Sequence, residues 1–415
     1  MRENGFMSLR ITGLGEEIGA VIGLPWEEPL ENWPEDPTLA EKRGISRHVV
    51  RLVKAADDAD DEHIYAIKET VAEFANREYK VLMELKQLGA PSVEAVAVIE
   101  GRTDRKGEEL PCALATRFLP YSAPYRVLLT QSVVAHDINN MANALALLLV
   151  RLHLLGFWWG DCSLSNTLFR RDADGFAAYL VDAETGEFQR NLSDGQREHD
   201  LEIAHFNVAA ELEDLQLSGV LYKGMDPIRA SDAVQRRYRR LWAALKEPKK
   251  LDPNDRHAVE RAMRELHDLG FAVEEVSVQM DAQTKTLAFQ PKLVAAGYHT
   301  QRIKDLMGLD TEELQAKRIL ASFDRYCTRQ PIGPAGKSKE ELAAQWLEEV
   351  FYPIIEAVPT NLSGRVEPAQ IFHEVLENRW FLSEKRGYDV GLDYAAKTYF
   401  EEVLPYRHDS GVAPR

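Results

Sequence analysis

The chain has 415 residues, of which 45% are hydrophobic, so a single small domain is excluded and two or three domains are expected. Its 67 acidic and 50 basic side chains give a net charge of -17, which argues against nucleic acid as a partner. The three cysteines lie far apart and indicate neither a disulfide framework nor a zinc site. With no run suited to a signal peptide or membrane span, we expect a cytoplasmic protein.

The first predicted region is an N-terminal arm, residues 1–36, because the segment 24–37 carries four prolines and two tryptophans. Alternating, β-branched segments and one amphipathic stretch follow this arm. They predict strands at 48–54, 64–68, 93–99 and 113–119, and a helix at 69–88. A small antiparallel sheet with one helix is therefore expected before residue 120.

Pro120 and Pro124 interrupt the strand pattern and mark a hinge. The elements predicted after the hinge are a helix at 132–155, strands at 167–169 and 178–181, and a helix at 202–217. A sheet lobe followed by a helical lobe is the order of the protein-kinase-like α+β fold. We therefore predict a kinase-like domain over residues 37–225, with an N-lobe at 37–119 and a C-lobe at 120–225.

The second half of the chain is predicted to be mainly helical with one β-hairpin. Its predicted parts are an α+β domain of unknown function at 226–329, with helices at 230–245 and 255–269 and a hairpin near 276–289, a linker at 330–338, and a helical segment at 339–415. Gly308-Leu309-Asp310 predicts the turn of a helical hairpin, in which Asp310 caps the second helix and Glu313 completes a capping box.

A motif in the predicted C-lobe points to phosphoryl transfer. In Gly160-Asp161-Cys162-Ser163-Leu164-Ser165-Asn166, the aspartate and asparagine have the separation of a kinase catalytic loop. There the aspartate accepts a hydrogen bond from the acceptor hydroxyl and the asparagine binds a metal ion. Asp182, at the end of the strand 178–181, is the expected second metal ligand. The predicted cofactors are ATP and Mg²⁺.

A lysine and a glutamate in the predicted N-lobe complete this pattern. Tyr65-Ala66-Ile67-Lys68 resembles the strand whose lysine meets the α and β phosphates, and we expect Lys68 to be catalytic and nucleotide-binding. Glu78 is its expected partner, because Leu82 and Leu85 after it form an inward-facing stripe. Taken alone, Lys68 and Glu78 have a simpler interpretation as ordinary surface charges. The ordered set with Asp161, Asn166 and Asp182 favours a nucleotide-binding kinase fold.

The chain departs from the protein-kinase pattern in two places. No G-x-G-x-x-G precedes Lys68, and Trp159-Gly160 stands where regulated kinases carry histidine-arginine, so phosphorylation of an activation loop is not predicted. Further nucleotide contacts are expected from the hairpin and the hinge. These are Gly44, Ser46, Arg47, Arg117, Phe118 and Leu119. Asp200 is interpreted either as a helix cap or as an anchor for the catalytic-loop backbone.

The residues 159–166 and 181–184 are similar to the loops of lipopolysaccharide (Kdo/heptose) kinases, aminoglycoside phosphotransferases and RIO-type kinases. The whole chain resembles bacterial lipopolysaccharide-kinase-like proteins that carry a C-terminal domain of unknown function. Residues 25–30, 43–48, 308–310 and 379–384 carry this closer resemblance. The resemblance implies a protein-kinase-like superfamily fold and phosphate chemistry, and leaves the substrate open.

We therefore expect an ATP- and Mg²⁺-dependent kinase that phosphorylates a hydroxyl of a sugar, a small molecule or a protein. The alternative is a pseudokinase, a nucleotide-binding module whose C-terminal half engages a protein partner. The missing glycine loop and the large non-kinase half favour it, whereas the retained polar residues argue against it. A third candidate is transfer of AMP on the same scaffold.

Overall fold

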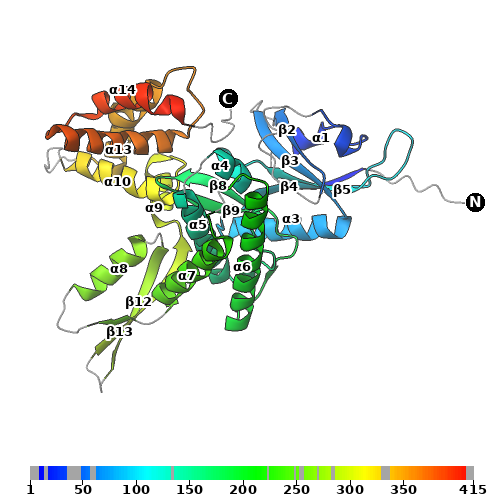
Figure 1. Ribbon diagram of the computed structural model, residues 1–415, viewed down its shortest axis with the longest axis horizontal. Helices are drawn as coiled ribbons and strands as arrows, with labels where there is room; N and C mark the ends of the chain where they lie inside the picture. The colour runs from blue at the N-terminus through cyan, green and yellow to red at the C-terminus, as the bar shows by residue number, and fades with distance from the viewer. Residues whose placement is uncertain are drawn as a thin grey trace, which may run out of the picture. The chain divides into compact units, whose positions relative to one another are not determined.

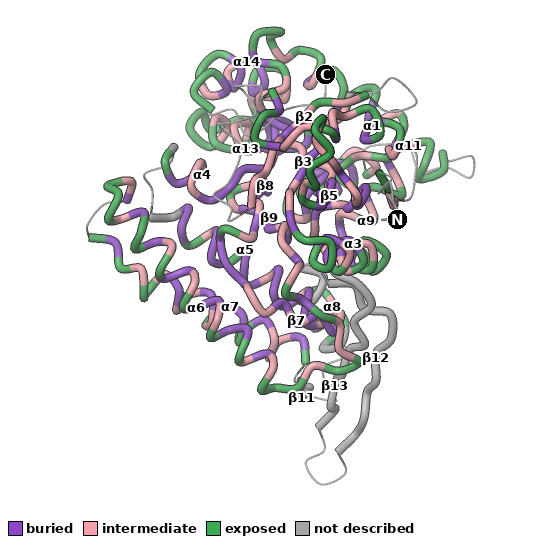
Figure 2. Tube along the Cα trace, turned by 90° about the vertical axis from the view of Figure 1, so that its right-hand side faces the viewer, coloured by how far each residue is buried: buried purple, intermediate pink, exposed green. Residues whose placement is uncertain are grey.

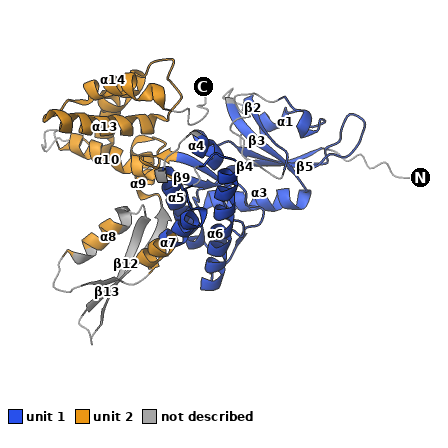
Figure 3. Ribbon diagram, viewed as in Figure 1, with its two compact units in different colours: residues 1–170, 178–237, 411–415 blue, residues 171–177, 238–410 orange. Residues whose placement is uncertain are grey.

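The computed structural model describes residues 9–13, 17–34, 48–56, 62–131, 135–221, 224–246, 249–251, 257–268, 271–281, 286–328 and 337–407. The chain divides into two compact units (Figure 3). Unit 1 consists of residues 1–170, 178–237 and 411–415, and unit 2 consists of residues 171–177 and 238–410. The division thus lies near residue 237 rather than 225, and a short segment around residue 174 belongs to the second unit.

A five-stranded antiparallel sheet forms the first part of unit 1 (Figure 1). Its strands, in spatial order, are β1 (Arg10–Gly13), β4 (Glu94–Glu100), β5 (Cys112–Arg117), β3 (Glu62–Thr70) and β2 (Val50–Ala56). Helix α3 (Ala72–Gln87) packs against β4 and β5. In β3 the side chains of Tyr65 and Ile67 are fully buried, so the alternation places Lys68 on the opposite face. The predicted sheet with one helix is confirmed.

The segment expected to be an N-terminal arm contributes to this sheet. Strand β1 pairs with β4, and it is followed by α1 (Ile18–Ile22) and the 3₁₀ turn η1 (Leu30–Asn32). Trp26 and Trp33 are each only 3% exposed and pack in the same core as the sheet residues. The prolines therefore shape a segment that covers the sheet core, rather than one lying outside the domain.

The rest of unit 1 is mainly helical. Its elements are β6 (Ser122–Pro124), α4 (Tyr125–Gln131), α5 (Ala135–Leu154), β7 (Phe157–Trp158), β8 (Thr167–Asp172), β9 (Gly175–Leu180), β10 (Glu187–Phe188), α6 (Asp194–Leu217) and α7 (Pro227–Lys246). The end of β8, the start of β9 and the part of α7 after residue 237 belong to unit 2. Buried residues, most of them apolar, run along α5 and α6. Figure 2 colours the buried parts of the trace purple. Helix α6 begins earlier than expected because Ser193 and Gln196 form a capping box.

Unit 2 combines a small sheet with a cluster of helices. Its elements are β11 (Lys249–Leu251), α8 (Ala258–Asp268), β12 (Phe271–Asp281), β13 (Thr286–Ala296), α9 (Tyr298–Met307), α10 (Glu313–Cys327), α11 (Lys339–Trp346), the π-helical turn η2 (Leu347–Phe351), α12 (Tyr352–Glu356), α13 (Pro368–Arg386), α14 (Leu392–Glu402) and η3 (Leu404–Tyr406). Phe323, Trp346 and Phe372 are buried in the core shared by the helices from α9 onward. The expected hairpin is present as β12 and β13, and most of the expected linker lies outside the described residues.

The turn between α9 and α10 is capped differently from the prediction. Gly308 ends α9 with a φ of 69°, as its position in the sequence suggested. The capping box of α10, however, consists of Glu312 and Gln315, so the predicted pair Asp310 and Glu313 is wrong. The Glu313 carboxylate instead accepts hydrogen bonds from the first backbone amides of α9.

The turn between β8 and β9 belongs to unit 2 and is held there by polar contacts. The Asp172 carboxylate accepts hydrogen bonds from the backbone amides of Leu314 and Gln315, each at 3.0 Å, at the start of α10. The Gln370 amide group donates to the Ala173 carbonyl and accepts from its backbone N–H. Burial raises the pKa of Asp172 to about 7, and the nearby Glu312 charge adds to the effect.

Among the described helices, none has the length and apolarity needed to cross a membrane.

Candidate active site

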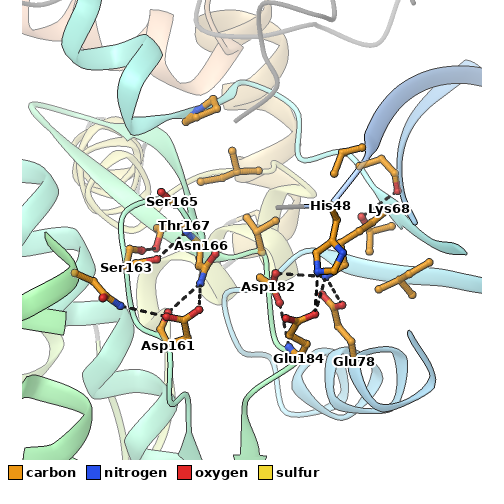
Figure 4. A pocket seen from close by; sticks show the side chains of 18 of the residues that line it. His48, Lys68, Glu78, Asp161, Ser163, Ser165, Asn166, Thr167, Asp182 and Glu184 are labelled. Atoms are coloured by element: carbon orange, nitrogen blue, oxygen red, sulfur yellow. Dashed lines mark hydrogen bonds and ion pairs between the residues drawn. The ribbon is translucent and has the colours of Figure 1, made fainter. Parts of the chain in front are cut away.

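A cavity of about 430 Å³ lies in unit 1, between the sheet and the helical part. The polar side chains predicted for phosphoryl transfer converge on it from separate elements (Figure 4). They are Lys68 of β3, Glu78 of α3, Asp161 and Asn166 of the loop after β7, and Asp182 after β9. Apolar side chains line another part of the cavity, among them Val50, Leu114 and Phe118.

Amide groups hold the Asp161 carboxylate in place. The Asn166 side-chain nitrogen donates to Asp161 Oδ2 at 2.9 Å and to the Asp161 carbonyl at 3.0 Å. The Asn207 side-chain nitrogen, from α6, donates to Asp161 Oδ1 at 3.2 Å. Because both carboxylate oxygens accept hydrogen bonds from fixed donors, the orientation of Asp161 is set before any substrate binds. The amide oxygen of Asn166 is left as its potential ligand atom.

The backbone of the loop 159–166 is anchored by Asp200. This residue is 0% exposed and accepts hydrogen bonds from the backbone amides of Trp159 at 2.8 Å and Gly160 at 2.7 Å. His153 Nε2 lies 3.0 Å from the same carboxylate. Burial lowers the pKa of His153, so the neutral ring donates its Nε2 proton to Asp200. The predicted anchor is confirmed, and the helix-cap interpretation is wrong because Asp200 lies inside α6.

Trp159 connects the loop 159–166 to the segment that carries Asp182. The Trp159 indole nitrogen donates to the Asp182 carbonyl at 3.0 Å, and the Thr185 hydroxyl donates to the Trp159 carbonyl at 2.9 Å. Gly160 has a φ of +76°, and a Cβ there would lie 2.8 Å from the Trp158 ring. Glycine is therefore required before Asp161 both by backbone conformation and by space.

Lys68 is surrounded by carboxylates. Its ammonium nitrogen lies 2.6 Å from Glu78, 3.3 Å from Asp182 and 3.7 Å from Glu184. Burial alone would lower the pKa of Lys68, but the neighbouring carboxylates raise it above its usual value, so the side chain stays charged. Burial raises the pKa of Glu78 to about 7, against the opposing effect of Lys68.

The donor set beside Lys68 fits a magnesium ion. Glu78, Asp182 and Glu184 offer carboxylate oxygens that all lie within 4.8 Å of one another. Lys68 pairs with all three carboxylates, and His48 Nε2 lies 3.6 Å from Glu184. Mg²⁺ prefers hard oxygen ligands and usually takes one or two carboxylates from the protein. Asp182 together with the Asn166 amide oxygen provides this chemistry, and Glu184 is an additional oxygen donor.

The structure separates the predicted nucleotide-binding residues into three groups. Phe118 lines the cavity. Arg117 is not among the residues that line it; its guanidinium contacts Glu17 at 3.0 Å and His63 at 3.1 Å. The Leu119 carbonyl accepts a hydrogen bond from Ser122, and its side chain is likewise not part of the lining. Gly44, Ser46 and Arg47 lie outside the described residues.

Two residues of α6 that the sequence analysis did not select support the loop. Besides Asn207, Glu211 accepts hydrogen bonds from the backbone amides of Leu164 at 2.8 Å and Ser165 at 2.9 Å. Burial raises the pKa of Glu211. The spacing of Asp200, Asn207 and Glu211 places them on one face of a helix, and this polar face is the signal by which they could have been found.

A lysine of an antiparallel sheet that pairs with a glutamate of the adjoining helix, facing the loop of Asp161 and Asn166 and the Asp182 carboxylate, is the arrangement of the protein-kinase-like class. The family model of the lipopolysaccharide kinase (Kdo/WaaP) family matches residues 63–224, and the model of a domain of unknown function (DUF4032) matches residues 240–404. The predicted resemblance to lipopolysaccharide-kinase-like proteins with such a C-terminal domain is therefore confirmed, and so is the kinase-like fold class.

Among solved structures, one described as WaaP in complex with acyl carrier protein is similar to this chain. The two share 16% sequence identity, with 56% of this chain and 92% of that chain covered and a TM-score of 0.32. No curated protein sequence matches the chain.

Proposed function

We propose that unit 1 is an ATP- and Mg²⁺-dependent phosphotransferase that transfers the γ-phosphoryl group to a hydroxyl. The observation that carries the proposal is the convergence of Lys68, Glu78, Asp161, Asn166 and Asp182 on one cavity. Lys68 and Asp182 are 114 positions apart in the sequence, so it is the fold that brings these residues together. Phosphoryl transfer depends mainly on positioning and charge stabilisation, for which this set is suited.

The nucleotide phosphates would meet the Lys68 ammonium. Glu78 holds that ammonium at 2.6 Å, which fixes its position and limits the cost of ordering a long side chain on binding. Asp182 and Asn166 would hold Mg²⁺, which neutralises phosphate charge when it is bound. The apolar lining formed by Val50, Leu114 and Phe118 offers a surface for the nucleotide base.

Asp161 would orient the acceptor hydroxyl and accept its proton. In the reaction the acceptor oxygen forms a bond to the γ-phosphorus, the bond from that phosphorus to the ADP oxygen breaks, and the hydroxyl proton passes to the carboxylate. Asn166 and Asn207 keep the carboxylate directed, while Asp200 holds the loop that carries it. Because ATP is the proposed donor, the cytoplasm is the proposed location.

The substitution Asp161→Asn tests the proposal. The variant is expected to lose about 10²- to 10⁴-fold in turnover, because the proton acceptor is removed. ATP affinity, measured by thermal shift with and without Mg²⁺, is expected to stay within a factor of about three. Glu202→Gln, an exposed change on α6, is the matched control. Full turnover in Asp161→Asn would refute the assignment.

ATP labelled at the γ or the α phosphate separates the remaining alternatives. Incubation with sugars, including Kdo and heptose, and with a protein extract is expected to transfer the γ label only. Transfer of the α label would instead indicate AMP transfer. Nucleotide binding without any turnover would favour the pseudokinase, a nucleotide-responsive module whose second unit engages a protein partner.

A further inference from the structure

A second group of potential ligands lies in unit 2, apart from the cavity of unit 1. His373 and Glu377 are one helical turn apart on α13, and Asp174 stands in the turn between β8 and β9. One nitrogen or oxygen atom from each of these three residues lies within 4.8 Å of the others. Both segments belong to the same compact unit, as the shared colour in Figure 3 shows.

The histidine of this group is buried without a hydrogen bond. His373 is only 3% exposed, and neither Nδ1 nor Nε2 has a hydrogen-bond partner within the described part of the chain. A buried polar group without a partner costs about 1–3 kcal/mol, and native structures rarely leave one unexplained. A cation held by this imidazole and the two carboxylates would give the ring nitrogen a partner.

The position of Asp174 relative to α13 is fixed by the neighbouring residues. Gln370, one turn before His373, exchanges hydrogen bonds of 3.0 and 3.1 Å with the Ala173 backbone. Asp172 is bound in turn to the start of α10. The turn is therefore held against α13 on one side and α10 on the other. These contacts fix the backbone position of Asp174 relative to His373 and Glu377, and none of them involves the Asp174 side chain.

The electrostatic surroundings are compatible with a bound cation. Burial lowers the pKa of His373, as does the charge of Arg318, so the ring is neutral as a ligand must be. Burial and the Asp174 charge raise the pKa of Glu377. Arg318 opposes a cation, but the two carboxylates of the group outweigh its single charge. The adjacent Glu374 is already engaged by Tyr399 and Arg407.

We propose that Asp174, His373 and Glu377 form a binding site for a divalent transition-metal ion of the Zn²⁺ class. One imidazole nitrogen and two carboxylate oxygens suit such an ion better than Mg²⁺ or Ca²⁺, which take oxygen ligands. Three protein ligands leave one coordination position for water. The bound ion would tie the β8–β9 turn to α13, and the site is independent of the proposed phosphotransferase activity.

Metal titration of the full-length protein tests this site. Chelator-treated protein is titrated with Zn²⁺ by calorimetry and with Co²⁺ by visible absorption, which reports the coordination of the ion directly. The wild type is expected to bind one Zn²⁺ that raises its melting temperature. Asp174→Asn, His373→Gln and Glu377→Gln are each expected to weaken this binding about 100-fold or more, since even outer-shell partners cost 10- to 100-fold.

Two controls make the result specific. His257→Gln removes an exposed histidine that directly precedes α8, and Asp182→Asn removes a carboxylate of the unit 1 cavity. Both are expected to keep the Zn²⁺ site. Asp174 is exposed, so Asp174→Asn is expected to preserve the fold. It therefore tests the site even if the change at the buried His373 unfolds the protein. Zn²⁺ affinity that is unchanged in Asp174→Asn and Glu377→Gln would overturn the proposal, as would a wild type that gives no saturable Zn²⁺ binding.

Discussion

Replacing Asp200 with asparagine would test whether this buried carboxylate holds the catalytic loop. Oδ2 accepts from the Trp159 amide and lies 3.0 Å from His153 Nε2, and Oδ1 accepts from the Gly160 amide. An asparagine has one oxygen and one NH₂ group, so in either orientation the NH₂ faces at least one donor. One buried donor is then left unpaired, and the remaining bonds lose the carboxylate charge.

The expected cost is on the order of 2–4 kcal/mol, from about 1–3 kcal/mol for the unpaired donor and the weakening of the remaining charged hydrogen bonds. Urea denaturation followed by tryptophan fluorescence measures this loss, because Trp159 is fully buried. Turnover is expected to fall about 100-fold, since displacement of a loop by 1 Å has effects of this size. The conservative change keeps the volume, so packing does not account for either loss.

The exposed Glu202→Gln on the same helix serves as the control and is expected to leave both the urea midpoint and turnover unchanged. The reasoning would be refuted by an Asp200→Asn protein with the urea midpoint of the wild type. Reduced stability with normal turnover would instead show that Asp200 supports the fold without positioning the loop.

Two further changes test other parts of the structure. Gly160→Ala is expected to lower stability more than Gly219→Ala: both positions have positive φ, at a cost of about 1–2 kcal/mol, but only at Gly160 would the added Cβ meet a ring, that of Trp158. Equal urea midpoints for the two variants would contradict the predicted clash. Asp172, whose pKa is raised from 3.8 to about 7, is protonated in the folded state where the unfolded chain is ionised. Stability is therefore expected to fall as pH rises from about 4 to 7, and Asp172→Asn to flatten this slope in urea titrations; an unchanged slope would refute the pKa shift.

The core of the candidate site was predictable because its signals are local. The five-residue separation of Asp161 and Asn166 can be read directly from the chain, and Lys68 and Asp182 follow strands with clear alternation. Asn207 and Glu211 were missed although their spacing from Asp200 carries a helical signal. Polar residues on a helix face are more often exposed than buried. Their spacing therefore identifies residues that hold a loop only when the structure shows the loop packed against that face.

Other differences arise from long-range contacts or from competition between neighbours. Strand β1 pairs with residues near position 100, and nothing local in its four residues specifies that partner. At the start of α10, Asp310 and Glu312 are both able to cap the helix, and caps differ by about 1 kcal/mol. The contact of Asp172 with the backbone at 314 and 315 helps decide where the helix begins, and this contact depends on residues more than 140 positions away.

The turn between β8 and β9 determines how this protein can be dissected. A chain shortened at residue 237 would retain the turn but lose Leu314, Gln315 and Gln370, so the Asp172 carboxylate and the Ala173 backbone would lose their partners. In such a fragment water would replace these partners, and the turn would lose the contacts that fix its conformation. Biochemical work on the kinase-like part therefore requires the intact polypeptide, or a fragment that restores polar partners to this turn.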